Sequence, residues 1–152
     1  MNRKDLKINF LGTYLLILLS LFVLIGIAIY IYKPYQELIN SLIMISLSGG
    51  IGGTIYTIRG FYQNLGKGIF DLRWTWWYIY RPIVSLVIGV FVYFLIVGGL
   101  LSIGGVSEVN YSKGLMFYAA IAFLAGFSFT QFTNKLEELT STIFSGKGDK
   151  GK

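Results

Sequence analysis

Long uninterrupted apolar runs dominate the chain. Four of them cover residues 9–32, 40–58, 83–103 and 114–133, and none contains Asp, Glu, Lys, Arg or His. A helix needs about 20 apolar residues to cross the roughly 30 Å hydrocarbon core of a bilayer. The pattern therefore predicts an all-α membrane protein, a four-transmembrane-helix bundle that forms a single domain over residues 1–145.

The pattern changes at the end of the fourth run. Apolar residues recur there at helical spacing, at Phe132, Leu136, Leu139 and Ile143. The charged Lys135, Glu137 and Glu138 fall on other sides of the same helical wheel. This predicts a short amphipathic helix over residues 134–144, which leaves the bilayer or lies along its surface. Residues 146–152 are expected to form a flexible basic tail.

The first run is expected to remain as a transmembrane helix. Its basic start, "MNRKDLK", would also suit a signal peptide. However, a run of about 24 residues is too long for the apolar core of a signal peptide, which has roughly 7 to 15 residues.

Basic residues are distributed unevenly among the segments outside the runs. The N-terminus, the middle loop and the tail hold Arg3, Lys4, Lys7, Arg59, Lys67, Arg73, Arg81, Lys135, Lys147, Lys150 and Lys152, whereas the other two connections hold Lys33 and Lys113. The positive-inside rule then places both termini and the middle loop on the cytoplasmic side of the cell membrane. Attraction to anionic headgroups at that face explains the net charge of +6 better than nucleic-acid binding, because no nucleic-acid-binding motif accompanies it.

The residue types that carry most catalysis are missing. The sequence has no Cys and no His, and its seven carboxylates all lie outside the four runs. The chain therefore lacks the commonest general base and metal ligand, and it has no membrane-embedded carboxylate to couple to an ion. "NLGKG" at residues 64–68 lacks the first Gly and the final Ser or Thr of a phosphate-binding loop. We expect no enzyme activity, no cofactor and no metal.

Small residues cluster in the second and fourth runs. "SLSGGIGGTIYTIRG" at residues 46–60 contains five glycines, four of which lie within the helix predicted over residues 40–58. In lipid, helices associate where small residues let their backbones approach closely. The predicted packing faces consist of Ser46, Gly49, Gly50, Gly53 and Thr57 in the second helix and Ala119, Ala122, Gly126 and Thr130 in the fourth. They are expected to join these helices to each other or to another subunit.

Two functions follow from these faces. The first is a non-enzymatic membrane component that self-associates or joins a complex through the small-residue faces. The alternative is a homo-oligomeric pore, such as a holin-like protein or toxic effector, lined by hydroxyl and amide groups at Ser46, Ser48, Thr54, Thr57, Thr130 and Gln131. Transport of a neutral solute ranks third.

An aromatic and basic stretch, "DLRWTWWYIYRP" at residues 71–82, precedes the third run. Trp and Tyr favour the headgroup zone of a bilayer. The predicted interfacial anchor or lipid-headgroup site consists of Arg59, Arg73, Trp74, Trp76, Trp77, Tyr78 and Arg81. Pro82 is expected in the first turn of the third helix. In the predicted outer loop, Asn110 begins a glycosylation triplet.

Three stretches together resemble a type of small prokaryotic four-helix integral membrane protein. They are "GGIGGTIYTIRGFY", "RWTWWYIYRPIVSLVIGVFVYFLIVGGLL" and "AAIAFLAGFSFTQFTNKLEEL", which lie within residues 49–139. The resemblance implies a glycine-rich second helix that ends in Arg and an amphipathic exit from the fourth helix, and it implies no catalytic residue. The small size and basic tail are also similar to those of holins.

Overall fold

The computed structural model describes residues 3–100 and 111–144, which are largely helical and contain no strand. The helices are α1 (Arg3–Tyr32), α2 (Glu37–Gly66), the short 3-10 helix η1 (Leu72–Trp74), α3 (Thr75–Val97), α4 (Tyr111–Phe127) and α5 (Phe129–Phe144). The predicted tail, residues 101–103 of the third run and Asn110 of the glycosylation triplet lie outside the described residues.

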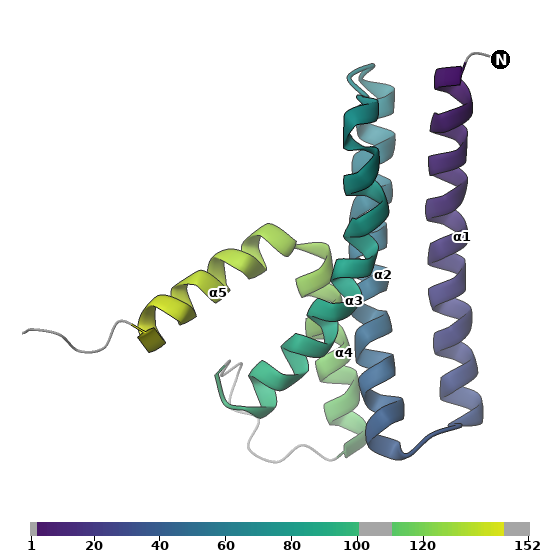
Figure 1. The fold of residues 1–152 in the computed structure, drawn as a ribbon. Helices are drawn as coiled ribbons and strands as arrows, with labels where there is room; N and C mark the ends of the chain where they lie inside the picture. Colours follow the sequence, from purple (N-terminus) through teal and green to yellow (C-terminus); the bar gives the residue numbers. More distant parts are fainter. Residues whose placement is uncertain (1–2, 101–110, 145–152) are drawn as a thin grey trace, which may run out of the picture.

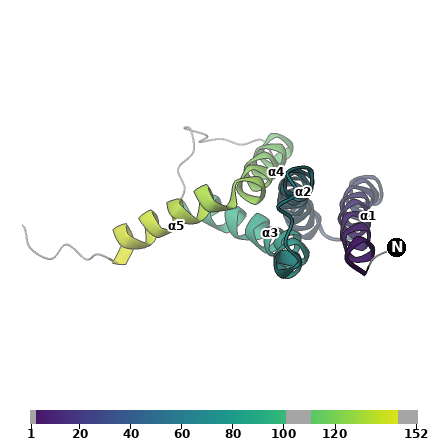
Figure 2. The same cartoon turned by 90° about the horizontal axis from the view of Figure 1, so that it is seen from above.

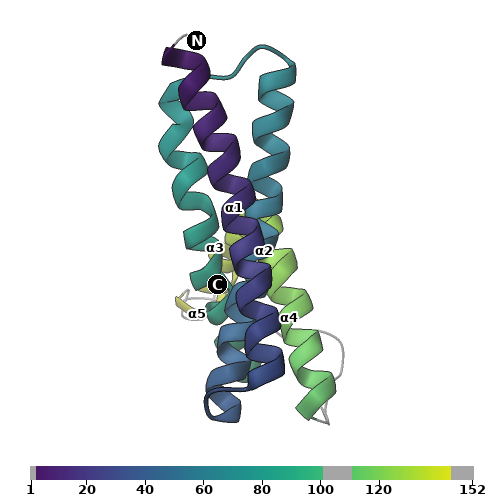
Figure 3. The same ribbon diagram turned by 90° about the vertical axis from the view of Figure 1, so that its right-hand side faces the viewer.

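α2 is the central helix of the bundle (Figures 1 and 2). It contacts α1, α3 and α4, and α3 also contacts α4. Seen from above, α5 projects away from the bundle on the side opposite α1. The side view shows α1 crossing in front of α2, with α4 beside the lower part of α2 (Figure 3). The arrangement of the bundle therefore depends mainly on what α2 presents to its three neighbours.

Three helices are long and apolar enough to cross a membrane, and a fourth candidate span is bent. The three lie within Lys4–Tyr32, Glu37–Gly66 and Leu72–Val97. Residues of α4 and α5 meet the same criterion only as a pair, and their axes differ by 104°. The structure thus agrees with the predicted all-helical membrane class and contains three to four candidate spans.

Pro82 lies inside α3, so the expectation that it occupies the first turn is wrong. α3 begins at Thr75, upstream of the proline. Asp71 caps the preceding 3-10 helix η1, since its Oδ1 accepts from the Arg73 N–H at 2.9 Å. η1 leads directly into α3, and Thr75 Oγ1 donates to the Leu72 carbonyl at 2.7 Å. α3 continues through Pro82, whose ring nitrogen has no N–H to donate.

The amphipathic helix begins earlier than the sequence indicates. The predicted run 114–133 breaks at Ser128, and α5 starts at Phe129 instead of residue 134. The Ser128 N–H still donates to the Leu124 carbonyl at 2.8 Å, while its own carbonyl accepts from the Phe132 N–H at 3.0 Å. The bend places Phe129 and Phe132 against the apolar cluster formed by α3 and α4. Side-chain packing on α3 therefore accompanies the break.

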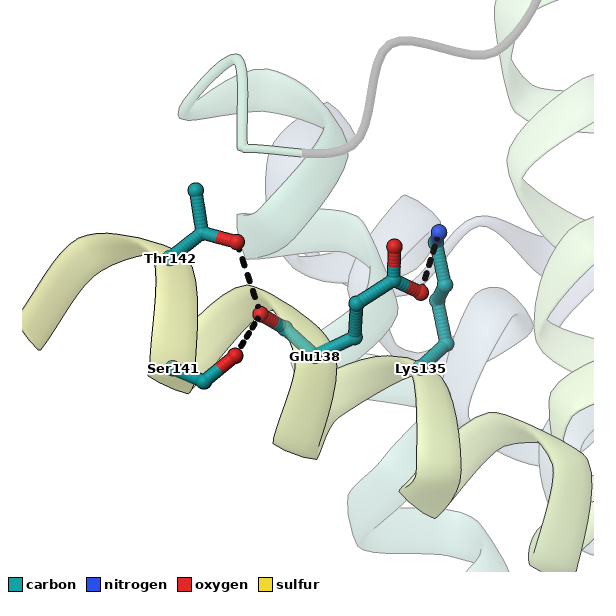
Figure 4. Close-up of polar contacts among 4 residues, drawn as sticks. All are labelled: Lys135, Glu138, Ser141 and Thr142. Carbon is teal, nitrogen blue, oxygen red and sulfur yellow. Dashed lines mark hydrogen bonds and ion pairs between the residues drawn. The ribbon is translucent and has the colours of Figure 1, made fainter. Parts of the chain in front are cut away.

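α5 carries its apolar and polar side chains on different faces. Leu136 and Leu139 are half-buried and continue the face that begins with the two phenylalanines. The opposite face makes its polar contacts within the helix (Figure 4). There the Lys135 ammonium pairs with the Glu138 carboxylate at 2.7 Å, and the hydroxyls of Ser141 and Thr142 donate to the Glu138 carbonyl at 2.8 and 2.9 Å. This is the two-sided character of a helix that lies at a membrane surface.

Cysteine labelling tests this placement of α5, because the chain has no native Cys. In nanodiscs, which expose both membrane faces, Asn134→Cys should react with a water-soluble maleimide several-fold faster than Leu136→Cys. The asparagine side chain is exposed, whereas the leucine lies on the apolar face. Equal rates at the two positions would contradict an interfacial α5.

Candidate functional site

Glycine brings α2 and α3 into backbone contact. A β-carbon at Gly49 would lie 2.6 Å from the Ser85 carbonyl oxygen and 2.9 Å from the Cα of Gly89. On the other side of this contact, a β-carbon at Gly89 would lie 2.8 Å from the Ile45 carbonyl oxygen. A β-carbon at Gly53 would collide with the Ser85 side chain. No side chain larger than hydrogen fits at these positions without separating the two helices.

A second face of α2 meets α4 in the same way. A β-carbon at Gly52 would collide with the Phe123 carbonyl oxygen, and one at Gly126 would collide with the Gly49 carbonyl oxygen. Gly49 therefore contacts both α3 and α4. The third face of α2, toward α1, is less tightly packed, because a β-carbon at Gly50 would lie 3.0 Å from the Phe22 ring. The same β-carbon would lie 2.5 Å from the Leu86 side chain of α3.

The hydroxyl groups of α2 are bonded within the chain. Ser46 donates to the Leu86 carbonyl of α3 at 3.0 Å, and Ser48 donates to the Ala119 carbonyl of α4 at 2.6 Å. Thr54 and Thr57 are fully buried, and each donates at 2.7 Å to the carbonyl four residues earlier in α2. The Ser46 and Ser48 bonds therefore add interhelical links to the glycine contacts, as is usual between membrane helices.

Arg81 lies where α2, α3 and α5 meet, enclosed by three aromatic rings. Its guanidinium carbon is 4.3 Å from the ring centre of Phe129, 5.0 Å from that of Tyr56 and 5.8 Å from that of Trp77. We call these four residues the Arg81 cage. Only 7% of the Arg81 surface is exposed, and its Nε is fully buried without a hydrogen-bond partner.

The rings of the Arg81 cage offset part of the cost of burying its charge. A desolvated cation over an aromatic face gains about 2 kcal/mol, whereas removing an ion from water costs several kcal/mol. The rings supply no acceptor for the Nε hydrogen. The site is therefore a cation that the described residues leave without an anion.

The other predicted anchor residues are spread over the same end of the bundle. Arg59 and Trp74 are exposed, and the Arg73 side chain is 91% exposed beside Asp71 at 3.8 Å. Trp76 stacks on Tyr80 at the surface. Tyr78 points inward instead: its hydroxyl accepts from Asn64 Nδ2 at 2.9 Å, and its ring stacks on Phe70. Of this predicted set, the structure brings only Trp77 and Arg81 into one site.

The predicted packing faces are mostly brought together, with two exceptions. The residues in contact between helices include Ser46, Gly49, Gly50, Gly53, Ala119 and Gly126, and Ala122 of α4 is fully buried. Thr57 is buried but bonds within α2, and Thr130 is exposed on α5, separated from Gly126 by the bend. Ser85 and Gly89 were not predicted, although two small residues four apart were a usable signal. Tyr56 and Phe129 were not predicted either, because their role depends on the bend.

A pair of glycine substitutions tests the backbone contacts. Gly49→Ala should lower the stability by about 1–3 kcal/mol, because the added methyl group overpacks the interface with α3. Gly60→Ala is the matched control: it lies on the same helix with nothing within 4 Å of an added β-carbon. This control should be neutral or stabilising by up to about 1 kcal/mol, since alanine favours helix. The thermal midpoint in mild detergent, followed by Trp fluorescence, measures both, and shifts of the same sign would contradict the packing.

No protein-family model matches this chain, and neither a curated protein nor a solved structure does. The function is therefore inferred from the chain's own side chains and their contacts.

Proposed function

We propose that this chain is a non-enzymatic integral membrane protein that acts by assembly with further copies of itself. In this proposal both termini and the loop between α2 and α3 face the cytoplasm, because the basic residues concentrate there. α4 is the fourth span, and α5 lies along the cytoplasmic surface. The absence of Cys and His from the sequence, and the position of its carboxylates outside the apolar runs, support a non-catalytic role.

The small-residue faces support assembly less directly than the sequence indicated. Gly49 and Gly126 lie against each other, and Ser85 and Gly89 of α3 cover the remaining small face of α2. These contacts build the single chain, so a contact between copies would use another surface.

The outer face of α1 is the surface that carries the proposal. The exposed fractions of Phe10, Ile17, Leu24 and Ile31 are 71, 62, 64 and 65%. These residues recur every seven positions, the spacing that keeps one face of a helix against a partner helix in a left-handed pair. The exposed hydroxyl residues Thr13 and Ser20 lie between them on the same face. Small hydroxyl residues among large apolar ones are typical of helix interfaces in membranes.

The structure offers less support for the pore alternative. A ring-shaped pore lined by α2 needs its hydroxyls to face water between subunits. Ser46 and Ser48 instead donate to carbonyls of α3 and α4, and Thr54 and Thr57 are fully buried. A pore lined by these groups would require α2 to separate from both neighbours. No contact in the described residues favours transport of a neutral solute either.

Single-cysteine cross-linking tests the assembly surface. Two copies inserted in the same direction meet in parallel, so a seam residue faces its own copy across the symmetry axis. Ser20→Cys should form disulfide-linked dimers in native membranes under mild oxidation. Ile25→Cys should not, because it is exposed but lies on a different side of α1.

Native mass spectrometry from nanodiscs supplies the independent count of subunits. A dimer or small oligomer together with Ser20 cross-linking supports the proposal. A monomer would overturn it. A closed ring of four or more subunits would overturn the proposal in favour of the pore if it conducts ions and if neither Ser20→Cys nor Ile25→Cys forms cross-linked dimers.

A further inference from the structure

Arg81 is the only buried charged side chain among the described residues. Charged groups inside membrane proteins are rare and usually face a partner, so an enclosed arginine marks a functional site whose partner must be identified. The Arg81 cage contains no carboxylate, and the buried Nε donates to no acceptor.

No ion pair to Arg81 is found among the described residues. Asp71 pairs with Arg73, and Glu138 pairs with Lys135. Both pairs are at the surface, with side chains at least half exposed. The missing anion therefore comes from outside this part of the chain.

We propose that Arg81 binds the phosphate group of a membrane phospholipid. A guanidinium presents a planar fork of N–H donors that matches the oxygens of a phosphate, and it keeps its charge when water is excluded. No internal carboxylate bonds this fork, and the buried Nε has no acceptor among the described residues, so an oxyanion that entered between the rings of the cage would supply one. This inference requires membrane insertion, but it does not depend on the assembly proposed above.

The surroundings of Arg81 favour a lipid over other sources of negative charge. Tyr56 and Trp77 form the wall of the cage and are 36 and 38% exposed, so the guanidinium lies one side chain below the surface. Exposed Trp76 and Tyr80 stack on each other nearby in the same segment. Partly exposed Trp and Tyr rings concentrate at headgroup level, where phosphates are the abundant anions. The amphipathic α5, which supplies Phe129, is suited to the same depth.

Lipid-dependent stability provides the test. The full chain is purified in dodecyl maltoside, which contains no phosphorus, and its thermal midpoint is followed by Trp fluorescence. Dioleoylphosphatidylglycerol is compared with dioleoylglycerol, which has the same acyl chains without phosphate, and with inorganic phosphate. Because a ligand that binds the folded state raises the midpoint, the phospholipid should raise it by several degrees more than dioleoylglycerol does. Inorganic phosphate should have little effect.

Two substitutions connect the response to Arg81. Arg81→Gln should abolish the difference between the two lipids. Arg81→Lys keeps the charge but loses the fork, and should retain a reduced difference. Lys67→Gln is the control that also removes one positive charge, and it should respond as the wild type does, because Lys67 is exposed in the loop before this segment and lies outside the predicted anchor set.

Native mass spectrometry keeps the test decisive if Arg81→Gln does not fold. The wild type should retain bound phospholipid at collision energies that strip it from Arg81→Lys. Equal responses to the two lipids, or a wild-type response in both Arg81 variants, would overturn the proposal. An equal shift with inorganic phosphate would overturn the lipid source in favour of a free anion. A loss of subunits in Arg81→Lys with lipid retention unchanged would identify a partner carboxylate and would also overturn it.

Discussion

At Gly49 the backbones of α2, α3 and α4 approach one another at distances that leave no room for a β-carbon. In a bilayer, lipid would not drive apolar helices together as water does, so the attraction between these helices would come from close packing and from hydrogen bonds between them. Both are present at this point, because Ser46 and Ser48 reach carbonyls of the same two neighbours. α1 packs against α2 mainly through larger side chains around Phe22 and Leu47.

The Arg81 cage depends on these contacts. Gly52 and Gly126 set the position of α4 along α2, and this brings Phe127 edge-on to Tyr56 at 5.7 Å. The bend at Ser128 then carries Phe129 over the guanidinium of Arg81. A side chain at the glycine contact would move α4 and with it one wall of the cage. Structural packing and the candidate binding site are therefore coupled through a single helix.

The sequence predicted the helical membrane class because each apolar run is long and uninterrupted, a local property of the chain. The same reasoning indicated the glycines of α2, since close approach requires small residues at regular spacing. It did not identify α3 as their partner, because Ser85 and Gly89 are set among large apolar residues that dominate the pattern. The burial of Arg81 could not be predicted, because it depends on Phe129, which reaches the guanidinium through a bend at Ser128 inside an uninterrupted apolar run. The α3 start was misplaced because Pro82 is a stronger signal in sequence than the short η1 helix that leads into α3.

The glycines at the helix contacts also determine how this sequence can change over evolutionary time. Exposed apolar positions such as Val87 and Val97 would meet only acyl chains in a bilayer, so they would tolerate exchange among apolar residues. At Gly49, Gly52 and Gly126 even alanine meets backbone atoms, which cannot rearrange as a flexible side chain can. Substitutions would therefore accumulate around the outside of the bundle while a few glycines stay fixed. Two chains with this architecture can diverge until little besides the spacing of their glycines remains in common.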